Sequence, residues 1–168
     1  MALAQYHRME KTLSKIPDLK AQYNQVLQEY LDFNHMEETS PYEPHAEKKS
    51  SFFLLHYAVV KPESKTNQVR VVFDGFSLND VLYSAPILQA DMIKIILGWG
   101  KYKFVVTGDI QKMYRQILIN QDDRTYKKLL LPPSQNDKIK TFQLKTVTFG
   151  INCAPFLDIR TLKQLSAD

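Results

Sequence analysis

The fold prediction starts from the stretch Tyr102-Lys103-Phe104-Val105-Val106-Thr107-Gly108-Asp109-Ile110-Gln111-Lys112-Met113-Tyr114-Arg115-Gln116-Ile117. Its aromatic and β-branched residues predict a strand that ends at Asp109. This strand would deliver one carboxylate, and the ring of Tyr114 follows five residues later. The pairing of a strand-end carboxylate with a nearby ring is the first candidate site in the sequence.

The composition is that of a folded chain. It has 168 residues, 44% hydrophobic and 11% aromatic, enough for a core in one domain or in a large piece of a bigger one. The single cysteine, Cys153, excludes an intramolecular disulfide and is typical of a reducing compartment. Residues 1–11 lack the apolar part of a leader, and no run of about 18 apolar residues occurs. We therefore expect a soluble, intracellular protein without a membrane partner; cytoplasm and nucleus both stay open.

Charge is unevenly distributed along the chain. Residues 1–50 carry 6 basic and 8 acidic side chains, whereas residues 51–168 carry 16 basic and 10 acidic ones. The basic second part suits a polyanionic partner, although a solvated surface accounts for the same counts.

Residues 1–50 predict two helices and a linker. A first helix is expected over residues 3–13 and a second over residues 18–34, with Pro17 between them. The apolar residues of the second helix recur near helical spacing, which is typical of packing rather than of a cofactor site. Residues 37–51 are polar and contain two prolines, so a linker is expected there.

From Phe52 onward the pattern predicts short strands separated by helices. Strands are expected over residues 52–60, 69–73, 116–119, 127–131 and 139–144, with one more ending at Asp109, and helices from Ser84 to Gly98 and from Ala154 to the end of the chain. The first two strands, joined by a polar turn, predict a hairpin. This order is typical of an α+β fold with a mostly antiparallel sheet.

Four separated blocks carry a resemblance to a known family. They are His56-Tyr57-Ala58-Val59-Val60-Lys61-Pro62-Glu63-Ser64-Lys65, then Arg70-Val71-Val72-Phe73-Asp74-Gly75 with Ser77-Leu78-Asn79-Asp80-Val81-Leu82, then the Asp109 stretch, then Thr146-Val147-Thr148-Phe149-Gly150-Ile151-Asn152-Cys153-Ala154-Pro155-Phe156-Leu157. In this order the blocks resemble the reverse transcriptase of Bel/Pao-type retrotransposons. The helical lead-in is also similar to the segment that precedes the polymerase in these polyproteins, so the resemblance covers nearly the whole chain.

The resemblance implies an architecture and an activity. Residues 51–168 would be the fingers and part of the palm of a right-hand polymerase, and residues 1–50 a helical lead-in and linker. The implied reaction is RNA-directed DNA synthesis, in which a deoxynucleoside triphosphate is joined to a primer 3′-hydroxyl by a two-metal mechanism with Mg²⁺. The implied partners are the RNA/DNA template–primer, deoxynucleoside triphosphates and other parts of a retroelement polyprotein.

The resemblance also implies roles in the Asp109 stretch. Asp109 would be a catalytic metal ligand, with the backbone carbonyl of Ile110 as a further ligand beside it. Tyr114 would lie beneath the sugar and exclude a 2′-hydroxyl. From the residues alone, Asp109 serves equally well as a turn cap after Gly108, and Tyr114 as a core aromatic residue with a wet hydroxyl.

Four more residues would bind the nucleotide. Lys61 and Arg70 would grip the triphosphate from the two arms of the fingers hairpin, where charge-assisted hydrogen bonds are strong. Phe149 and Gly150 would lie against the nucleotide, because glycine lets the backbone approach closely. By themselves the two cations are typical of solvated strand ends, and Gly150 of a turn.

The chain departs from the family pattern in two places. Only Phe76 separates Gly75 from Ser77, where the family carries a longer Gly/Ser/Asn-rich insertion, and a true deletion and a misjoined gene model both stay open. The Tyr-x-Asp-Asp hairpin with the other catalytic carboxylates is also missing, and Asp158, expected within the last helix, is no substitute. We therefore expect the isolated chain to be inactive as a polymerase.

Two other interpretations stay open. The chain could be a non-catalytic nucleic-acid-binding or interaction remnant of a retroelement polyprotein, or an unstable product with an unpaired apolar edge at residues 141–149. Lys112 and Arg115 either contact backbone phosphates or are exposed charges. Other enzyme classes have little support, because the histidines do not pair at metal-ligand spacing and no phosphate-binding glycine loop occurs.

Overall fold

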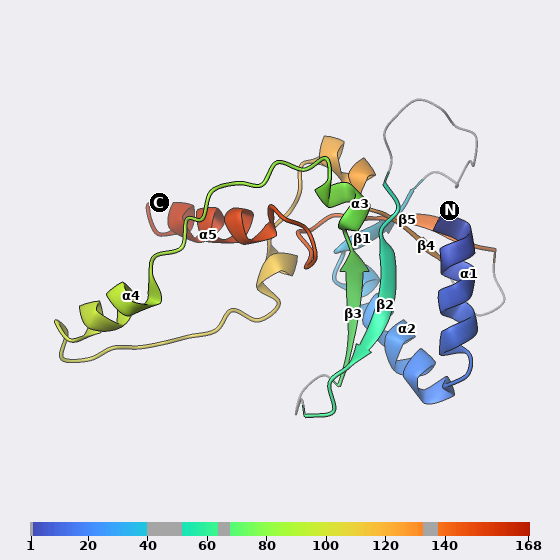
Figure 1. Ribbon diagram of the computed structural model, residues 1–168, viewed down its shortest axis with the longest axis horizontal. Helices are drawn as coiled ribbons and strands as arrows, with labels where there is room; N and C mark the ends of the chain where they lie inside the picture. The colour runs from blue at the N-terminus through green and yellow to red at the C-terminus, as the bar shows by residue number, and fades with distance from the viewer. Residues whose placement is uncertain (1, 40–51, 64–67, 133–137) are drawn as a thin grey trace.

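A computed structural model describes residues 2–39, 52–63, 68–132 and 138–168. Helices, short antiparallel strands and 3₁₀ turns alternate along these ranges, which confirms the α+β class. A mostly antiparallel sheet was expected, and the strands of the described residues form two antiparallel sheets, one of three strands and one of two. Figure 1 shows both sheets and the first two helices in one body, from which a long segment projects to one side.

The two N-terminal helices form much as predicted. α1 spans Ala2–Leu13 and α2 spans Pro17–Asp32, with Pro17 in the first turn of the second helix, where its missing N–H costs nothing. α2 buries Tyr23, Leu27 and Tyr30 on one face. The apolar stripe read from the sequence is therefore the face that packs into the core.

The three-stranded sheet has the order β1-β5-β4 and is antiparallel throughout. β4 (Lys128–Leu131) and β5 (Lys140–Leu144) were predicted, whereas β1 (Met36–Glu38) lies where a linker was expected. The rest of that linker, residues 40–51, lies outside the described residues. Of the unpaired edge predicted over residues 141–149, residues 141–144 lie in the central strand β5 and residues 145–147 bond to residues 117–119, so the prediction was wrong for residues 141–147.

The two-stranded sheet pairs the two strands of the predicted hairpin, whose turn at residues 64–67 lies outside the described residues. β2 (Leu55–Val60) and β3 (Val69–Asp74) pair in antiparallel register, with His56 opposite Phe73 and Val59 opposite Arg70. α3 (Phe76–Asn79) follows directly after Gly75.

Residues 83–111 form a projecting arm that the sequence did not predict. The arm carries α4 (Met92–Trp99) at its far end and returns along an elongated path to η1 (Met113–Gln116) (Figure 1). The predicted helix start at Ser84 was wrong: α4 begins at Met92, after Asp91, whose side chain accepts a hydrogen bond from the Ile93 N–H at 2.9 Å. The aspartate side chain satisfies a backbone N–H that the first turn of the helix leaves without a partner, so it stabilises a start at Met92.

The strand predicted to end at Asp109 does not form. Residues 104–110 have no hydrogen-bonded strand neighbour within the described part of the chain, and their side chains are exposed. No strand forms over the predicted residues 116–119. Gln116 is the last residue of η1, and Leu118 forms a single bridge with Thr146. A β-propensity pattern yields a strand only where a partner strand satisfies its backbone.

The last elements close the fold. η2 (Gln121–Tyr126) leads into β4, and α5 (Ala154–Leu165) begins with proline in its first turn as predicted. α5 ends at Leu165 rather than running to the end of the chain.

One hydrophobic core joins residues from both predicted parts of the chain. It includes Leu13, Tyr23 and Tyr30 from the helices together with Phe73 and Leu144 from the two sheets. The division into residues 1–50 and 51–168 stays a prediction, but the described parts on either side share this core.

Candidate functional site

The β2–β3 hairpin places Lys61 and Arg70 on the same face. The Lys61 N–H donates to the Gln68 carbonyl at 2.7 Å, which continues the ladder two pairs beyond the Val59–Arg70 pair. Because side chains alternate along a strand, Lys61 and Arg70 share the face that also carries Tyr57, and all three are exposed. The opposite face holds the buried His56 and Phe73. The hairpin therefore presents two cations and one ring to solvent.

Two glycines allow a close backbone crossing behind this hairpin. Gly150 has φ +90°, and a Cβ on it would meet the Phe73 carbonyl oxygen at 2.4 Å. A Cβ on Gly75 would meet the Gly150 carbonyl oxygen at 2.7 Å. Both positions therefore exclude a side chain, for reasons of space and, at Gly150, of backbone conformation.

Asn79 ties the same two segments together. Its amide nitrogen donates to the Gly150 carbonyl at 2.8 Å, and its oxygen accepts from the Asn152 N–H at 2.9 Å. One side chain at the end of α3 thus satisfies backbone groups on both sides of the Gly150 turn.

Tyr114 meets Phe149 next to this turn. The two rings lie 4.5 Å apart at an interplanar angle of 72°, an edge-to-face contact. Burial raises the pKa of Tyr114, and the Asp158 carboxylate on α5 raises it further. The structure therefore brings together residues from three of the four sequence blocks, and we call Gly75, Asn79, Tyr114, Phe149 and Gly150 the motif cluster.

Asp109 and Ile110 lie outside the motif cluster and do not belong to the hydrophobic core of the described residues. Both lie exposed on the return path of the projecting arm, and Asp109 makes no hydrogen bond or ion pair with the described residues. No group of three or more Asp, Glu, His or Cys side chains among the described residues could hold a metal ion. Two magnesium ions require several hard oxygen ligands, so these residues do not fit a two-metal site, and we derive no metal-dependent step from them.

Lys112 and Arg115 turn toward the N-terminal helices rather than toward solvent. Lys112 Nζ pairs with the Glu29 carboxylate, and Arg115 Nη2 lies 3.4 Å from the same carboxylate. The Arg115 guanidinium also lies 3.9 Å above the Tyr30 ring and donates from Nε to His35 at 3.1 Å. Burial lowers the pKa of Arg115, and burial and Arg115 together lower that of His35. The interpretation of both cations as free surface charges was therefore wrong.

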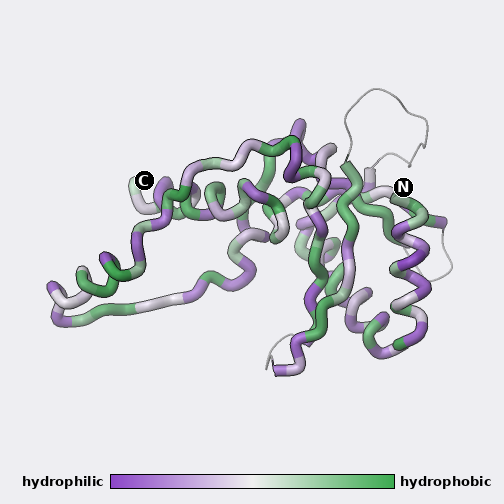
Figure 2. The backbone as a smooth tube through the Cα atoms, viewed as in Figure 1, coloured by the Kyte–Doolittle hydropathy of each residue, from purple (hydrophilic) through white to green (hydrophobic). Residues whose placement is uncertain are grey.

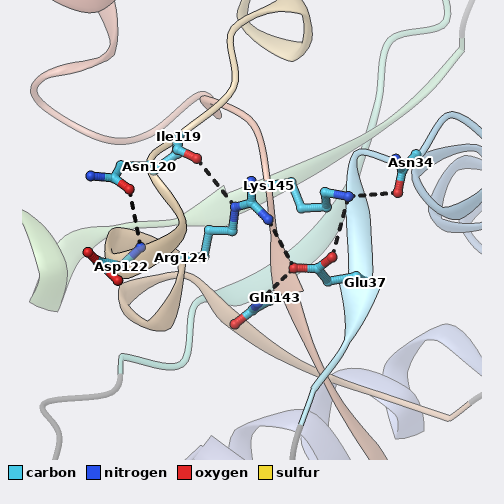
Figure 3. Close-up of polar contacts among 8 residues, drawn as sticks. All are labelled: Asn34, Glu37, Ile119, Asn120, Asp122, Arg124, Gln143 and Lys145. Atoms are coloured by element: carbon cyan, nitrogen blue, oxygen red, sulfur yellow. Dashed lines mark hydrogen bonds and ion pairs between the residues drawn. The ribbon is translucent and has the colours of Figure 1, made fainter.

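A polar cluster that no sequence pattern indicated surrounds Glu37 on β1 (Figure 3). The Glu37 carboxylate accepts from Gln143 at 2.8 Å and pairs with Arg124 at 3.2 Å and Lys145 at 3.3 Å. The hydrogen bond from Gln143 and the two cations lower the pKa of Glu37. Because Lys145 also donates to Asn34 at 2.8 Å, the cluster fastens β1 and the end of α2 to β5. Nothing in the local pattern distinguishes Glu37 from a linker residue, since its partners are distant in sequence.

Two buried ionisable side chains were also missed. Lys127 is 3% exposed, its Nζ donates to the Thr146 carbonyl, and burial lowers its pKa to about 7. His56 is 6% exposed, hydrogen-bonds to Tyr23 through Nδ1 and lies 3.3 Å from the Leu130 carbonyl through Nε2. Burial lowers the pKa of His56 to about 4. Two sequence features could have indicated this burial. An apolar run follows Lys127, and His56 lies in a segment predicted to be a strand.

Comparison with known proteins adds no assignment. The sequence matches no family model and no curated protein. Among the described residues, no helix has both the length and the apolar character needed to cross a membrane.

Proposed function

We propose that this chain is the fingers and part of the palm of an RNA-directed DNA polymerase of the Bel/Pao type. The observation that carries the proposal is the motif cluster. Three blocks that resemble the family in sequence also meet in space, through the Gly75–Gly150 crossing, the Asn79 hydrogen bonds and the Tyr114–Phe149 contact. This convergence supports the proposal, because a nucleotide site built from these blocks requires them to lie together.

The hairpin supports the same proposal. A triphosphate needs cations that reach it from one side, and Lys61 and Arg70 share the outward face of β2 and β3. In the proposed enzyme these two residues grip the incoming nucleotide, Tyr114 bounds its sugar, and Phe149 and Gly150 line its other side. Only in a longer enzyme that supplied further carboxylates would Asp109 and the Ile110 carbonyl be metal ligands.

We propose further that residues 1–168 alone do not polymerise. One carboxylate does not hold two Mg²⁺ ions, and among the described residues Asp109 belongs to no group of three or more Asp, Glu, His or Cys side chains that could hold a metal ion. The same observation favours the second candidate, a nucleic-acid-binding remnant, in which the basic residues of the hairpin retain contacts to phosphates without chemistry.

A binding experiment and an extension experiment test these proposals together. Binding of a labelled DNA primer on an RNA template is measured by fluorescence anisotropy over a salt titration, and extension by gel with Mg²⁺ and all four deoxynucleotides. We expect salt-dependent binding and no extension. Replacing Lys61 and Arg70 together by Gln should make the plot of log binding constant against log salt concentration less steep, by the amount expected for the loss of about two phosphate contacts. The matched control is Lys11→Gln with Arg8→Gln on α1.

The outcomes separate the possibilities. Extension of the primer would overturn the proposed inactivity of the isolated chain. Binding that the hairpin substitutions do not change would remove the nucleic-acid contacts proposed for Lys61 and Arg70 in the second candidate. Absence of any binding would remove both candidate functions for this chain by itself.

A further inference from the structure

The projecting arm exposes an unusual amount of apolar surface. None of its residues belongs to the hydrophobic core of the described chain, and α4 has no buried residue. Figure 2 shows hydrophobic colour recurring along α4 and along the return path toward η1. On that return path Phe104 is 80% exposed and Val106 is 93% exposed. Isolated apolar side chains on a surface are ordinary, but a contiguous stretch of this length marks an interaction surface.

The backbone of the return path is open as well. Residues 103–110 make no backbone hydrogen bond with the described residues, and they have no strand neighbour there. A row of free N–H and C=O groups beside β-prone side chains is a template for pairing with another strand.

The side chains of this path alternate in character. Tyr102, Phe104, Val106 and Ile110 occupy one parity, with Gly108 among them, and Lys103, Val105, Thr107 and Asp109 occupy the other. The path bends at Tyr102 and Lys103, where Lys103 Nζ lies 5.5 Å from the centre of the Phe104 ring. If pairing extends the whole segment, the first set lies on one face and the second on the opposite face. One face would then be apolar, and the other would carry the Lys103 cation near one end and the Asp109 anion near the other.

This pattern is self-complementary in antiparallel register. If Val106 lies opposite Val106 of a second copy, Lys103 faces Asp109 of that copy, and the reverse pair forms by symmetry. On the other face Phe104 covers the bare Gly108 of the second copy, and Tyr102 meets Ile110. Aromatic residues opposite glycine and unlike charges opposite each other both stabilise paired strands.

We propose that residues 102–110 pair antiparallel with the same segment of a second copy of this chain, centred on Val106. The charge complementarity between Lys103 and Asp109 selects this partner and this register, since a shift by two residues places neither charge opposite its complement. The contact is isologous, so it closes at a dimer. The exposed apolar side chains of α4 lie in the same arm and add to the surface buried between the copies.

The proposal goes beyond the proposed function and uses no nucleotide or nucleic acid. It concerns the isolated chain, because the longer enzyme proposed above would use Asp109 as a metal ligand rather than as a partner for Lys103. Its test is the oligomeric state of the intact chain. Sedimentation velocity from micromolar to submillimolar protein should show a concentration-dependent monomer–dimer equilibrium.

A charge exchange tests the register. Lys103→Asp places two like charges opposite each other at both ends of the ladder, as does Asp109→Lys, and each should weaken the dimer by about tenfold. The double variant K103D/D109K restores both pairs in the exchanged order and should recover the dimer. Lys94→Asp on α4 is the matched control for a change of net charge, and its effect should stay within about threefold.

Cysteine cross-linking tests the centre of the ladder. In a Cys153→Ala background, Val106→Cys should form a disulfide-linked dimer under mild oxidation, because the two residues lie directly opposite. Thr107→Cys is the control. It would face Val105 of the second copy, and the two introduced thiols would lie about 7–8 Å apart across a diagonal.

Three results would overturn the proposal. They are a monomer throughout the concentration range, a dimer that the exchanged double variant fails to restore, and equal cross-linking at positions 106 and 107. The first of these would leave another chain, or another segment of a longer product, as the occupant of the arm. None of them bears on nucleic-acid binding by the hairpin, so this proposal and the proposed function fail separately.

Discussion

Gly150 crosses so close to Phe73 that a Cβ on the glycine would come within 2.4 Å of the Phe73 carbonyl oxygen. The crossing joins the end of β3 to the turn before α5, two segments more than seventy residues apart. The motif cluster therefore depends on a backbone contact that only glycine permits.

Gly150→Ala should destabilise the chain by about 2–4 kcal/mol, because φ +90° is strained for alanine and the Phe73 carbonyl must move. Chemical denaturation with circular dichroism measures the change. Gly98→Ala in α4 is the control, since its Cβ would meet nothing within 4 Å and alanine favours a helix. An equal loss in both variants would contradict the close crossing.

Asn79→Asp should produce a pH-dependent defect. The aspartate keeps the acceptor for the Asn152 N–H but, when ionised, has no donor for the Gly150 carbonyl. Protonation restores a donor, so the carboxyl group should have a raised pKa in the folded chain. The loss of stability relative to the original chain should be about 1–2 kcal/mol at neutral pH and shrink as the pH falls toward about 4. Asn120→Asp is the control, because Asn120 only accepts a hydrogen bond, from the Asp122 N–H.

Much of the fold follows from local sequence patterns. The helices α1, α2 and α5 and the two hairpin-like pairs β2–β3 and β4–β5 were predictable, because helical spacing, Pro positions and alternation act within short segments. The elements that failed depend on distant partners. β1 is a strand only because β5 and the Glu37 cluster hold it, and residues 104–110 are not a strand because nothing in the described chain pairs with them.

The candidate site divides in the same way. Sequence blocks indicated Tyr114, Phe149 and Gly150, and the structure places these three together. Asn79 lay within a quoted block, but its two backbone hydrogen bonds required the folded chain. The functional roles of Asp109, Ile110, Lys61 and Arg70 stay predictions, and the arm that carries Asp109 was not foreseeable from a strand pattern.

Arg115→Ala should cost about 2 kcal/mol, because it removes the stacking on Tyr30 and the hydrogen bond to His35. It should also raise the pKa of His35, since Arg115 is one of two causes that lower it. Denaturation and NMR titration measure these two effects. Arg160→Ala is the control, because Arg160 is exposed on α5 and lies 5.9 Å from its nearest ring, Phe156. Its effect should stay within about 0.5 kcal/mol.

Lys127 should make the chain more stable as the pH rises above neutrality. Its folded-state pKa of about 7 lies below the ordinary value of 10.5, so between these values the unfolded chain binds more protons. Stability should therefore increase by about 2 kcal/mol from pH 7 to about 9, below the range in which unfolded tyrosines ionise. Lys127→Met should abolish this rise, whereas Lys140→Met, at an exposed ion pair with Glu38, should retain it. A rise that survives in Lys127→Met would assign it to other groups.

His56 should destabilise the chain in mild acid. Burial lowers its pKa to about 4 in the folded state from an ordinary 6.5, so the unfolded chain takes up the proton first as the pH falls. In the neutral ring Nδ1 accepts from the Tyr23 hydroxyl and Nε2 lies 3.3 Å from the Leu130 carbonyl. After protonation both ring nitrogens donate, so the Tyr23 hydroxyl has to turn and accept, and the charge stays buried. Stability should be full above about pH 6.5 and fall by roughly 2–3 kcal/mol toward pH 4. His56→Gln should be less stable at neutral pH but flatter across this range, and His7→Gln on α1 should keep the original slope. Parallel slopes for the original chain and His56→Gln would show that His56 does not carry the acid sensitivity.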